Sequence, residues 1–344
     1  MITKVVQPTQ DAILEAARLL ENGELVAFPT ETVYGLGANA LDAEAVRRIY
    51  EAKGRPSDNP LIVHVSSPQA AEPLCFMDER AKRLMEAFWP GPLTLLLPKK
   101  PIIPAATNAG LPSVAIRMPS HPVAHAMLAA CKVPIAAPSA NLSGRPSPTT
   151  AQHVLEDMDG RIPLILDGGA CYVGLESTVL DMTAEIPTIV RPGGATREML
   201  LTVLPDVKVA DSVMRPLAKG EKAVSPGMMY RHYAPKGQLT LVKGAPKQVQ
   251  AACLRLYEEA DAQGHKACIL IPEEHAEWYK QCRTLTIGSL KHPETLAHSI
   301  FAALRRMDDE QVEVILCETV ETSGIGLALM NRLCRAAAFH VLEV

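Results

Sequence analysis

The sequence predicts an α/β protein with two domains. Its 344 residues are long for a single hydrophobic core, 48% of them are hydrophobic, and strand-like and helical patterns alternate in two separate stretches. The periodicity fades over residues 206–237 and resumes after them. We therefore expect a first domain over residues 1–205, a linker over 206–237 and a smaller α/β domain over 238–344.

In the first stretch, apolar runs predict strands and apolar stripes at helical spacing predict helices. One stripe covers residues 11–22 and another covers 81–88, and a third helix follows Asp42, a good N-cap, so Lys53 and Arg55 should lie on the loop just past its end. The segment 29–37 should be a strand-like run that ends in a glycine-rich turn. Strands are expected at residues 24–28, 61–65, 93–97, 114–116, 135–136, 164–166, 178–180 and 188–190.

The second stretch repeats the alternation on a smaller scale. Strands are expected at residues 239–242, 267–271, 284–287 and 312–317, and helices near 246–262, 293–307 and 327–338. A G-x-G at Gly324 and Gly326 precedes the last helix, but the third glycine of a dinucleotide-binding loop is missing. The pattern therefore does not favour a dinucleotide there.

Composition narrows the functional classes. The net charge is −4 and aromatic residues make up 4%, which argues against a generally basic nucleic-acid binder that stacks many bases. The eight cysteines include no C-x-x-C pair and are typical of small core residues in a reducing compartment. The chain shows neither a secretory pattern nor a membrane-length apolar run, so we expect a cytoplasmic protein with no membrane partner.

Cationic and small polar residues gather in several short segments. Lys53-Gly54-Arg55 combines two cations with a glycine, and Ser139-Ala140-Asn141 offers a hydroxyl and an amide beside a small residue. Arg117 and Arg191 each end an apolar run, as either salt-bridged structural residues or anion ligands. Cations next to small residues suit a polyanion held against the backbone. No G-x-x-x-x-G-K-[ST] is present, so the pattern predicts a nucleotide site of another kind than a P-loop.

These motifs resemble the YrdC family of threonylcarbamoyl-AMP synthases in its long, two-domain form. The resemblance is carried by Lys53-x-Arg55, Ser139-x-Asn141 and the segments 29–37, 113–119 and 225–235. It implies a YrdC-like twisted mixed sheet with a cationic concave cavity, followed by a Rossmann-like C-terminal domain. It also implies a nucleotidyltransferase that converts L-threonine, bicarbonate and ATP to threonylcarbamoyl-AMP and pyrophosphate.

The same resemblance implies partners and site residues. Mg²⁺ would accompany ATP, no residue would form a separate metal site, and the product would pass to the downstream tRNA threonylcarbamoyl transferase machinery, with tRNA as a further partner. Lys53 and Arg55 would be catalytic, and the linker would close over the site as a lid. The implied threonine contacts are Thr32, His64, Arg117, Ala137 and Ser177; the implied ATP contacts are Arg55, Asn59, Ser113, Ser139, Asn141, Ser147, Arg191 and Tyr230.

Two other hypotheses fit parts of the pattern. A double-stranded RNA- or tRNA-binding module without catalysis would use the same cationic residues, and strongly salt-dependent RNA binding would favour it. The related domain of hydrogenase-maturation carbamoyltransferases also handles a carbamoyl adenylate. Those proteins carry zinc-binding cysteine pairs, and this chain has no such pair.

Overall fold

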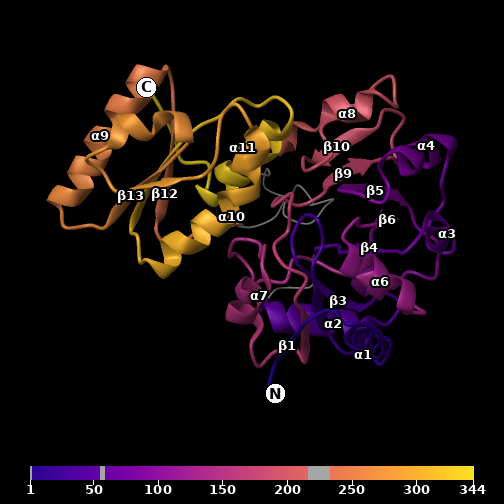
Figure 1. The fold of residues 1–344 in the computed structure, drawn as a ribbon. Coiled ribbons are helices and arrows are strands. Elements are labelled where there is room, and N and C mark those ends of the chain that lie inside the picture. The colour runs from indigo at the N-terminus through magenta and orange to yellow at the C-terminus, as the bar shows by residue number, and fades with distance from the viewer. Residues whose placement is uncertain (1, 55–58, 216–232) are drawn as a thin grey trace. The chain divides into compact units, whose positions relative to one another are not determined.

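The computed structural model describes residues 2–54, 59–215 and 233–344 of the chain (Figure 1). They form two compact units. Among the described residues, the first unit holds those up to Ser143 and Ser147–Val213, and the second holds Gly144–Pro146, residues 214–215 and residues 233–344. The expected α/β class with two sheets is confirmed.

The first unit is built on an 11-stranded mixed sheet. Neighbouring strands of this sheet pair in both parallel and antiparallel orientation: β4 and β6 are parallel, β5 and β6 antiparallel, and β5 and β9 parallel. Segments far apart in the sequence therefore lie side by side. In order across the sheet the strands are β1 (Lys4–Val6), β8 (Leu164–Leu166), β2 (Val26–Phe28), β3 (Gly35–Asn39), β7 (Ile135–Ala136), β4 (Ile62–His64), β6 (Ser113–Arg117), β5 (Leu93–Pro98), β9 (Thr178–Asp181), β10 (Thr188–Arg191) and β11 (Lys208–Val209).

Helices cover both faces of this sheet. Apolar residues of α1 and α6 pack with Phe28 and Ile135 on one face, and α2, α4 and α7 pack with Ala27 and Val63 on the other. The helices of the unit are α1 (Gln10–Glu21), α2 (Ala43–Lys53), α3 (Pro68–Ala71), α4 (Glu79–Phe88), α5 (Ala105–Asn108), α6 (Pro122–Ala130), α7 (Ala151–Met158) and α8 (Arg197–Leu201), with a 3₁₀ turn, η1 (Asp211–Val213).

The ends of α2 confirm one prediction and correct another. Asp42 is the N-cap, and its carboxylate accepts hydrogen bonds from the backbone N–H groups of Glu44 and Ala45. Lys53 does not lie on the following loop; it is the last residue of the helix. Gly54 ends the helix one residue later because it adopts a left-handed conformation, with φ of 60°.

The predicted glycine-rich turn near residue 35 is wrong, because this segment forms strand β3. Its glycines serve packing instead. A Cβ atom on Gly37 would lie 3.0 Å from both the Ile135 Cγ2 and the Phe28 Cε1 atoms, and one on Gly35 would lie 3.3 Å from the Ala137 Cβ. The missing side chains let neighbouring strands carry larger residues on this face.

The second unit contains a five-stranded, all-parallel sheet. Apolar residues of α9 pack with those of β12, β13 and β15, and α10 and α11 pack against each other. Parallel strands joined by helical crossovers give the Rossmann-like architecture expected for this part. The order across the sheet is β14 (Thr284–Thr286), β13 (Ala267–Ile271), β15 (Val314–Glu318), β12 (Gln238–Lys243) and β16 (Val341–Glu343), and the helices are α9 (Pro246–Ala262), η2 (Glu273–Tyr279), α10 (Pro293–Asp309) and α11 (Ile325–Ala336).

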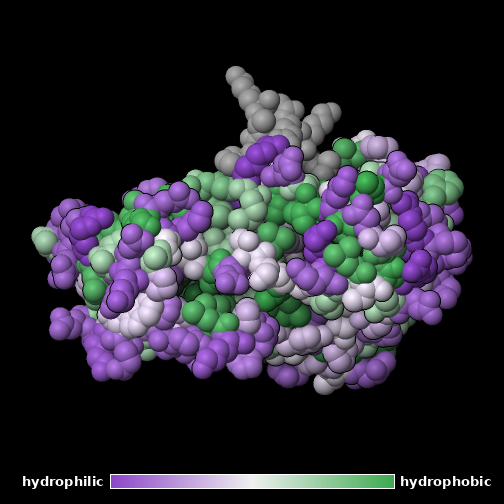
Figure 2. Space-filling view, turned by 90° about the horizontal axis from the view of Figure 1, so that it is seen from above, coloured by the Kyte–Doolittle hydropathy of each residue, from purple (hydrophilic) through white to green (hydrophobic). Residues whose placement is uncertain are grey.

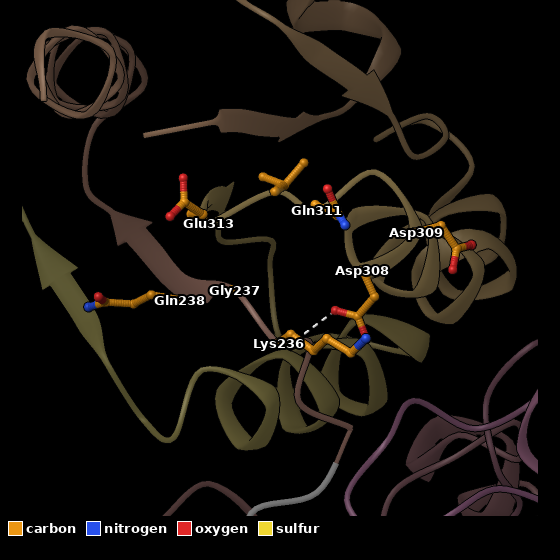
Figure 3. Close-up of a pocket in the computed structure, with 8 residues that line it drawn as sticks. Lys236, Gly237, Gln238, Asp308, Asp309, Gln311 and Glu313 are labelled. Atoms are coloured by element: carbon orange, nitrogen blue, oxygen red, sulfur yellow. Dashed lines mark hydrogen bonds between the residues drawn. The ribbon is translucent and has the colours of Figure 1, made fainter. Parts of the chain in front are cut away.

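The surface mixes polar and apolar residues. On the face shown in Figure 2, hydrophilic residues alternate with hydrophobic patches. Within the described ranges, no helix has the length and apolar character needed to cross a bilayer. A pocket of about 710 Å³ lies in the second unit (Figure 3). At this pocket the Lys236 backbone N–H donates to the Asp308 carboxylate at 2.6 Å. None of the site residues predicted from the sequence lines this pocket.

Candidate functional site

Five strands, β4, β6, β5, β9 and β10, are consecutive neighbours in the first sheet (Figure 1). His64 pairs with Arg117, and Arg117 pairs with Thr94. Thr94 lies opposite Val179, whose partner on the other side is Arg191. Directly paired residues in a sheet project to the same face. The row of paired residues therefore brings together four polar side chains, from β4, β6, β5 and β10, with Val179 of β9 between the last two.

This row continues the face that α1 and α6 cover. Ile135, which packs under these helices, is the register partner of His64, and Ala137 follows it on the same face. The aromatic ring of Phe28 meets the His64 ring edge-on, with 6.1 Å between centroids. The predicted threonine contacts His64, Arg117 and Ala137 thus lie where the apolar cover of the sheet gives way to polar residues.

Arg117 is bound by three neighbours. Its Nη2 lies 2.6 Å from Glu31 Oε1, its Nη1 donates to Thr32 Oγ1 at 2.9 Å, and its Nε donates to the Gly91 carbonyl at 3.2 Å. The side chains of Arg117 and Glu31 are 4% and 0% exposed, so this is a buried ion pair. A guanidinium group has five N–H donors. One N–H group on each terminal nitrogen is therefore left over from these contacts.

The hydroxyl of Thr32 is oriented by its neighbours. Thr30 Oγ1 donates to the Val33 carbonyl at 2.6 Å, because that oxygen can only accept. The 2.8 Å contact between the two threonine hydroxyls must then use the Thr32 proton. One lone pair of the Thr32 oxygen accepts from Arg117, so the only hydrogen-bonding capacity left on this hydroxyl is its second lone pair, which is an acceptor. A ligand group that meets Thr32 must be a donor, such as an ammonium or a hydroxyl.

His64 is neutral. Burial first, and then the positive charges of Arg117 and Arg191, lower the pKa of its imidazole to about 3. Its Nδ1 lies 3.1 Å from the Ile62 carbonyl, which can only accept, so this geometry assigns the proton to Nδ1. The neutral ring keeps an acceptor on Nε2 and adds no charge to a region that already holds two guanidinium groups.

Ser177 joins Arg191 to the row. Arg191 Nη2 donates to the Ser177 hydroxyl and carbonyl, both at 3.0 Å, and the Ser177 hydroxyl lies 2.8 Å from Thr94 Oγ1. This packing needs a glycine nearby, since a Cβ atom on Gly193 would lie 2.2 Å from the Glu176 carbonyl oxygen. Ser177, a predicted threonine contact, and Arg191, a predicted ATP contact, are therefore hydrogen-bonded to each other.

Lys53 anchors the loop that carries Ser139 and Asn141. Its Nζ donates to the carbonyl oxygens of both residues at 2.6 Å, and its own carbonyl accepts from the Ser143 N–H at 3.0 Å. Ser139 Oγ donates to Asn141 Oδ1 at 2.5 Å. The side chain of Lys53 is buried, so its charge is held beside this loop. Lys53 and the segment Ser139-Ala140-Asn141, which are far apart in the sequence, are therefore joined by hydrogen bonds in the structure.

The other predicted ATP contacts lie apart from the row. Ser147 Oγ donates to Glu176 Oε1 at 2.6 Å. Glu176 directly precedes Ser177 in the chain. Asn59 and Ser113 lie at the opposite ends of β4 and β6 from His64 and Arg117, about 13 Å away along β6. The Asn59 side-chain amide is buried and has no hydrogen-bond partner among the described residues.

Two predicted site residues, Arg55 and Tyr230, lie outside the described residues, as does most of the expected lid.

Three residues of the site were missed in the predicted set: Glu31, Thr94 and Glu176. Glu31 and Glu176 stand beside predicted residues, but nothing in the sequence shows that Arg117 and Ser147 are their partners. Thr94 carried a usable signal, because it is the one polar residue in the apolar run 93–97. In the described ranges, no three His, Cys, Asp or Glu side chains come together to hold a metal ion.

The fold and this row define an α/β protein with a buried group of cationic, acidic and hydroxyl side chains on one face of its first sheet. The donors are the free N–H groups of Arg117 and the acceptors include Thr32 and neutral His64. Comparison with known proteins makes the class specific. One family model, described as telomere recombination and covering Sua5, YciO and YrdC, matches residues 18–193, and a second, described as the threonylcarbamoyl-AMP synthase C-terminal domain, matches residues 195–338.

Full-length relatives agree with the family models. The chain is 47% identical to threonylcarbamoyl-AMP synthase of Bacillus subtilis, over 99% of this chain and 97% of the relative. It is 45% identical to that of Pyrococcus abyssi, over 96% and 95%. The crystal structure of P. abyssi Sua5 complexed with L-threonine superposes with a TM-score of 0.90 at 43% identity, covering 100% of this chain and 99% of that one. This chain belongs to the threonylcarbamoyl-AMP synthase family, in its two-domain form.

Proposed function

We propose that this chain is a nucleotidyltransferase that makes L-threonylcarbamoyl-AMP and pyrophosphate from L-threonine, bicarbonate and ATP. The observation that carries the proposal is the buried array of Glu31, Arg117 and Thr32, which offers guanidinium donors and a hydroxyl acceptor side by side. These groups match the carboxylate, ammonium and hydroxyl of threonine. Family membership at full length and the L-threonine complex of a relative support the same substrate.

The chemistry requires positioning and charge neutralisation more than covalent catalysis. The amine of threonine and bicarbonate form a carbamate with loss of water, and a carbamate oxygen attacks the α-phosphorus of ATP as pyrophosphate leaves. The carbamate is a weak and unstable nucleophile, so the site must exclude water and hold the reactants in contact. The burial of His64, Arg117 and Arg191 suits this task.

On the nucleotide side, the proposed contacts are the predicted ones, Arg191 among them. Arg191 and Lys53 would offset the charge that develops on the phosphates, with Arg55 as a further cation. Mg²⁺ enters as part of the nucleotide substrate, because this ion binds mainly through phosphate oxygens and water. The remaining proposed contacts are Asn59, Ser113, Ser139, Asn141, Ser147 and Tyr230.

The product would serve tRNA modification. We propose that its threonylcarbamoyl group passes to the adenosine next to the anticodon through a separate transferase, which works in the cytoplasm with this chain. A mixed anhydride of a carbamate and AMP hydrolyses readily, so a transferase that consumes it must act close to where it is made.

Pyrophosphate release tests the proposal. Purified full-length chain is incubated with MgATP, L-threonine and bicarbonate, and each substrate is omitted in turn. We expect release only when all three are present. Release without threonine would indicate a different adenylating enzyme or an uncoupled ATPase. No release together with salt-dependent binding of RNA would favour the RNA-binding module instead.

A further inference from the structure

Glu31 gives the threonine end of the site a negative charge that the predicted contacts do not include. Its Oε1 lies 2.6 Å from Arg117 Nη2, and both side chains are buried. We propose that Glu31 is a specificity-determining residue, which makes the site select a zwitterionic amino acid over a simple carboxylate anion. The proposal rests on the proposed function, which places threonine at Arg117.

Glu31 is fixed in place from three directions. Its Oε1 faces Arg117, its Oε2 accepts a hydrogen bond from the Ser120 N–H at 3.2 Å, and its backbone carbonyl accepts from the Val173 N–H at 2.8 Å. The side chain is 0% exposed. A ligand that reaches Arg117 therefore also meets the field of a carboxylate that cannot swing away.

The ion pair changes what Arg117 can bind. A lone buried guanidinium attracts any anion, but a guanidinium paired with a carboxylate forms a unit of zero net charge. A simple carboxylate placed at the free N–H groups of Arg117 is attracted by Arg117 and repelled by Glu31. An amino acid brings its own ammonium group, so the attraction of Glu31 for that group offsets the repulsion.

The neutral neighbours favour the same ligand. Thr32 has only an acceptor lone pair left, and the neutral His64 ring has an acceptor on Nε2. Neither group donates to a carboxylate. Acceptors match an ammonium or hydroxyl group, so the donors of Arg117 and the acceptors around it divide the site between the two ends of an amino acid.

Binding calorimetry on the full-length chain tests the proposal without turnover. The probes are L-threonine and 3-hydroxybutyrate, which is threonine without its ammonium group. We expect the wild-type chain to bind threonine at least about 100-fold more tightly than 3-hydroxybutyrate. Glu31→Gln keeps the side-chain shape and an acceptor oxygen but removes the charge. It should reduce this ratio at least about tenfold, by weakening the binding of threonine and tightening that of 3-hydroxybutyrate.

Asp308→Asn is the matched control. Asp308 is also a buried carboxylate that accepts a backbone hydrogen bond, but it lies in the second unit. Its substitution should leave the ratio unchanged. A purely structural Glu31 would instead show Glu31→Gln weakening both ligands by the same factor, which overturns the proposal.

The wild-type chain decides the matter if Glu31→Gln does not fold. Comparable affinities of the wild type for threonine and 3-hydroxybutyrate would overturn the role of Glu31, even if pyrophosphate release still requires threonine. A wild-type chain that neither binds threonine nor releases pyrophosphate would overturn the proposed function and this inference together. The two failures are therefore distinguishable.

Discussion

His64 lies beside Arg117, with Arg191 further along the same row, and stays neutral because it is buried and both guanidinium groups are positive. Protonating this ring in the folded chain would add a third positive charge to a buried row. The unfolded chain has no such restriction, so its histidine takes up a proton near the ordinary pKa of about 6.5. This difference links the stability of the chain to pH.

We predict that His64 makes the chain sensitive to acid. The folded pKa of about 3 lies below the unfolded value, so the neutral histidine stabilises the fold fully above about pH 6.5. That contribution is lost progressively as the pH falls toward 3. His64→Gln should therefore flatten the decline of the urea midpoint between pH 6.5 and 4, measured by circular dichroism. His292→Gln, at a side chain that is 69% exposed, should leave the decline as it is in the wild type.

Arg117 and Arg55 are predicted to act on different substrates. Arg117→Ala should raise the KM for threonine about 10- to 100-fold, because it removes charged hydrogen bonds to the carboxylate. Arg55→Ala should raise the KM for ATP by a similar factor and leave that for threonine nearly unchanged. Initial rates of pyrophosphate release at varied substrate concentrations measure both. Equal effects of each variant on both KM values would contradict the division.

Arg117→Ala also strands Glu31 as an unpaired buried carboxylate, which destabilises a fold by about 3–5 kcal/mol. The double variant Arg117→Ala/Glu31→Gln removes this penalty. It should recover much of the free energy of unfolding without recovering threonine binding, which separates the two roles of Arg117.

At the scale of the elements, the ends of strands β9 and β10 meet through backbone that leaves no room for a side chain. A Cβ atom on Gly193 would lie 2.2 Å from the Glu176 carbonyl oxygen and 2.4 Å from the Ser177 carbonyl carbon. These atoms cannot give way without moving Ser177, the residue that Arg191 binds. The site therefore depends on how closely two strand ends approach each other.

Gly193→Ala should raise the KM for both threonine and ATP and cost about 1–3 kcal/mol of stability, as overpacking does. Gly169→Ala is the matched comparison: a Cβ atom there meets nothing within 4 Å, although φ is +84°. It should cost about 1–2 kcal/mol through backbone strain alone and leave both KM values unchanged. Kinetics and urea unfolding of the two variants make the comparison; unchanged KM values in Gly193→Ala would disprove the packing argument.

At the scale of the whole molecule, the second unit includes a short segment from the middle of the first, Gly144–Pro146. Arg305 of α10, 1% exposed, donates from Nη2 to the Pro146 carbonyl at 2.7 Å. The Ala234 N–H donates to the Gly144 carbonyl at 3.0 Å. The compact units thus do not follow chain order throughout, and the boundaries expected at residues 205 and 237 stay predictions.

We predict that substituting Arg305 by alanine destabilises the chain much more than substituting its neighbour Arg306. Arg305→Ala removes a buried donor from a buried carbonyl and should lower the stability of the second unit by about 1–3 kcal/mol. Arg306→Ala removes an ion pair with Glu310 in which the arginine is solvent-exposed, and it should lower the stability far less than Arg305→Ala does. Differential scanning calorimetry of the full chain measures both. Similar shifts of the transition in the two variants would show that the Pro146 contact contributes little.

The sequence by itself determined the fold class and most of the elements. Periodicity located most of the strands, α1 and α4 of the first unit and the three α-helices of the second, and Asp42 marked the start of α2, because these signals depend on residues a few positions apart. It did not locate β1, β11, β16 or the helices α3, α5, α6, α7 and α8. Local signals also placed Lys53 within one residue of its helix end. They failed at β3, where glycines that pack against Phe28 and Ile135 look the same in sequence as glycines of a turn.

Only the tertiary structure decided which side chains meet. Glu31 and Arg117 are 86 residues apart, and Lys53 is 86 residues from Ser139, yet the mixed sheet and its loops bring each pair within 2.6 Å. The direction of the Thr32 hydroxyl and the neutral state of His64 follow from those contacts. No local pattern encodes them, because strand order and register, which set these distances, depend on how the whole sheet packs.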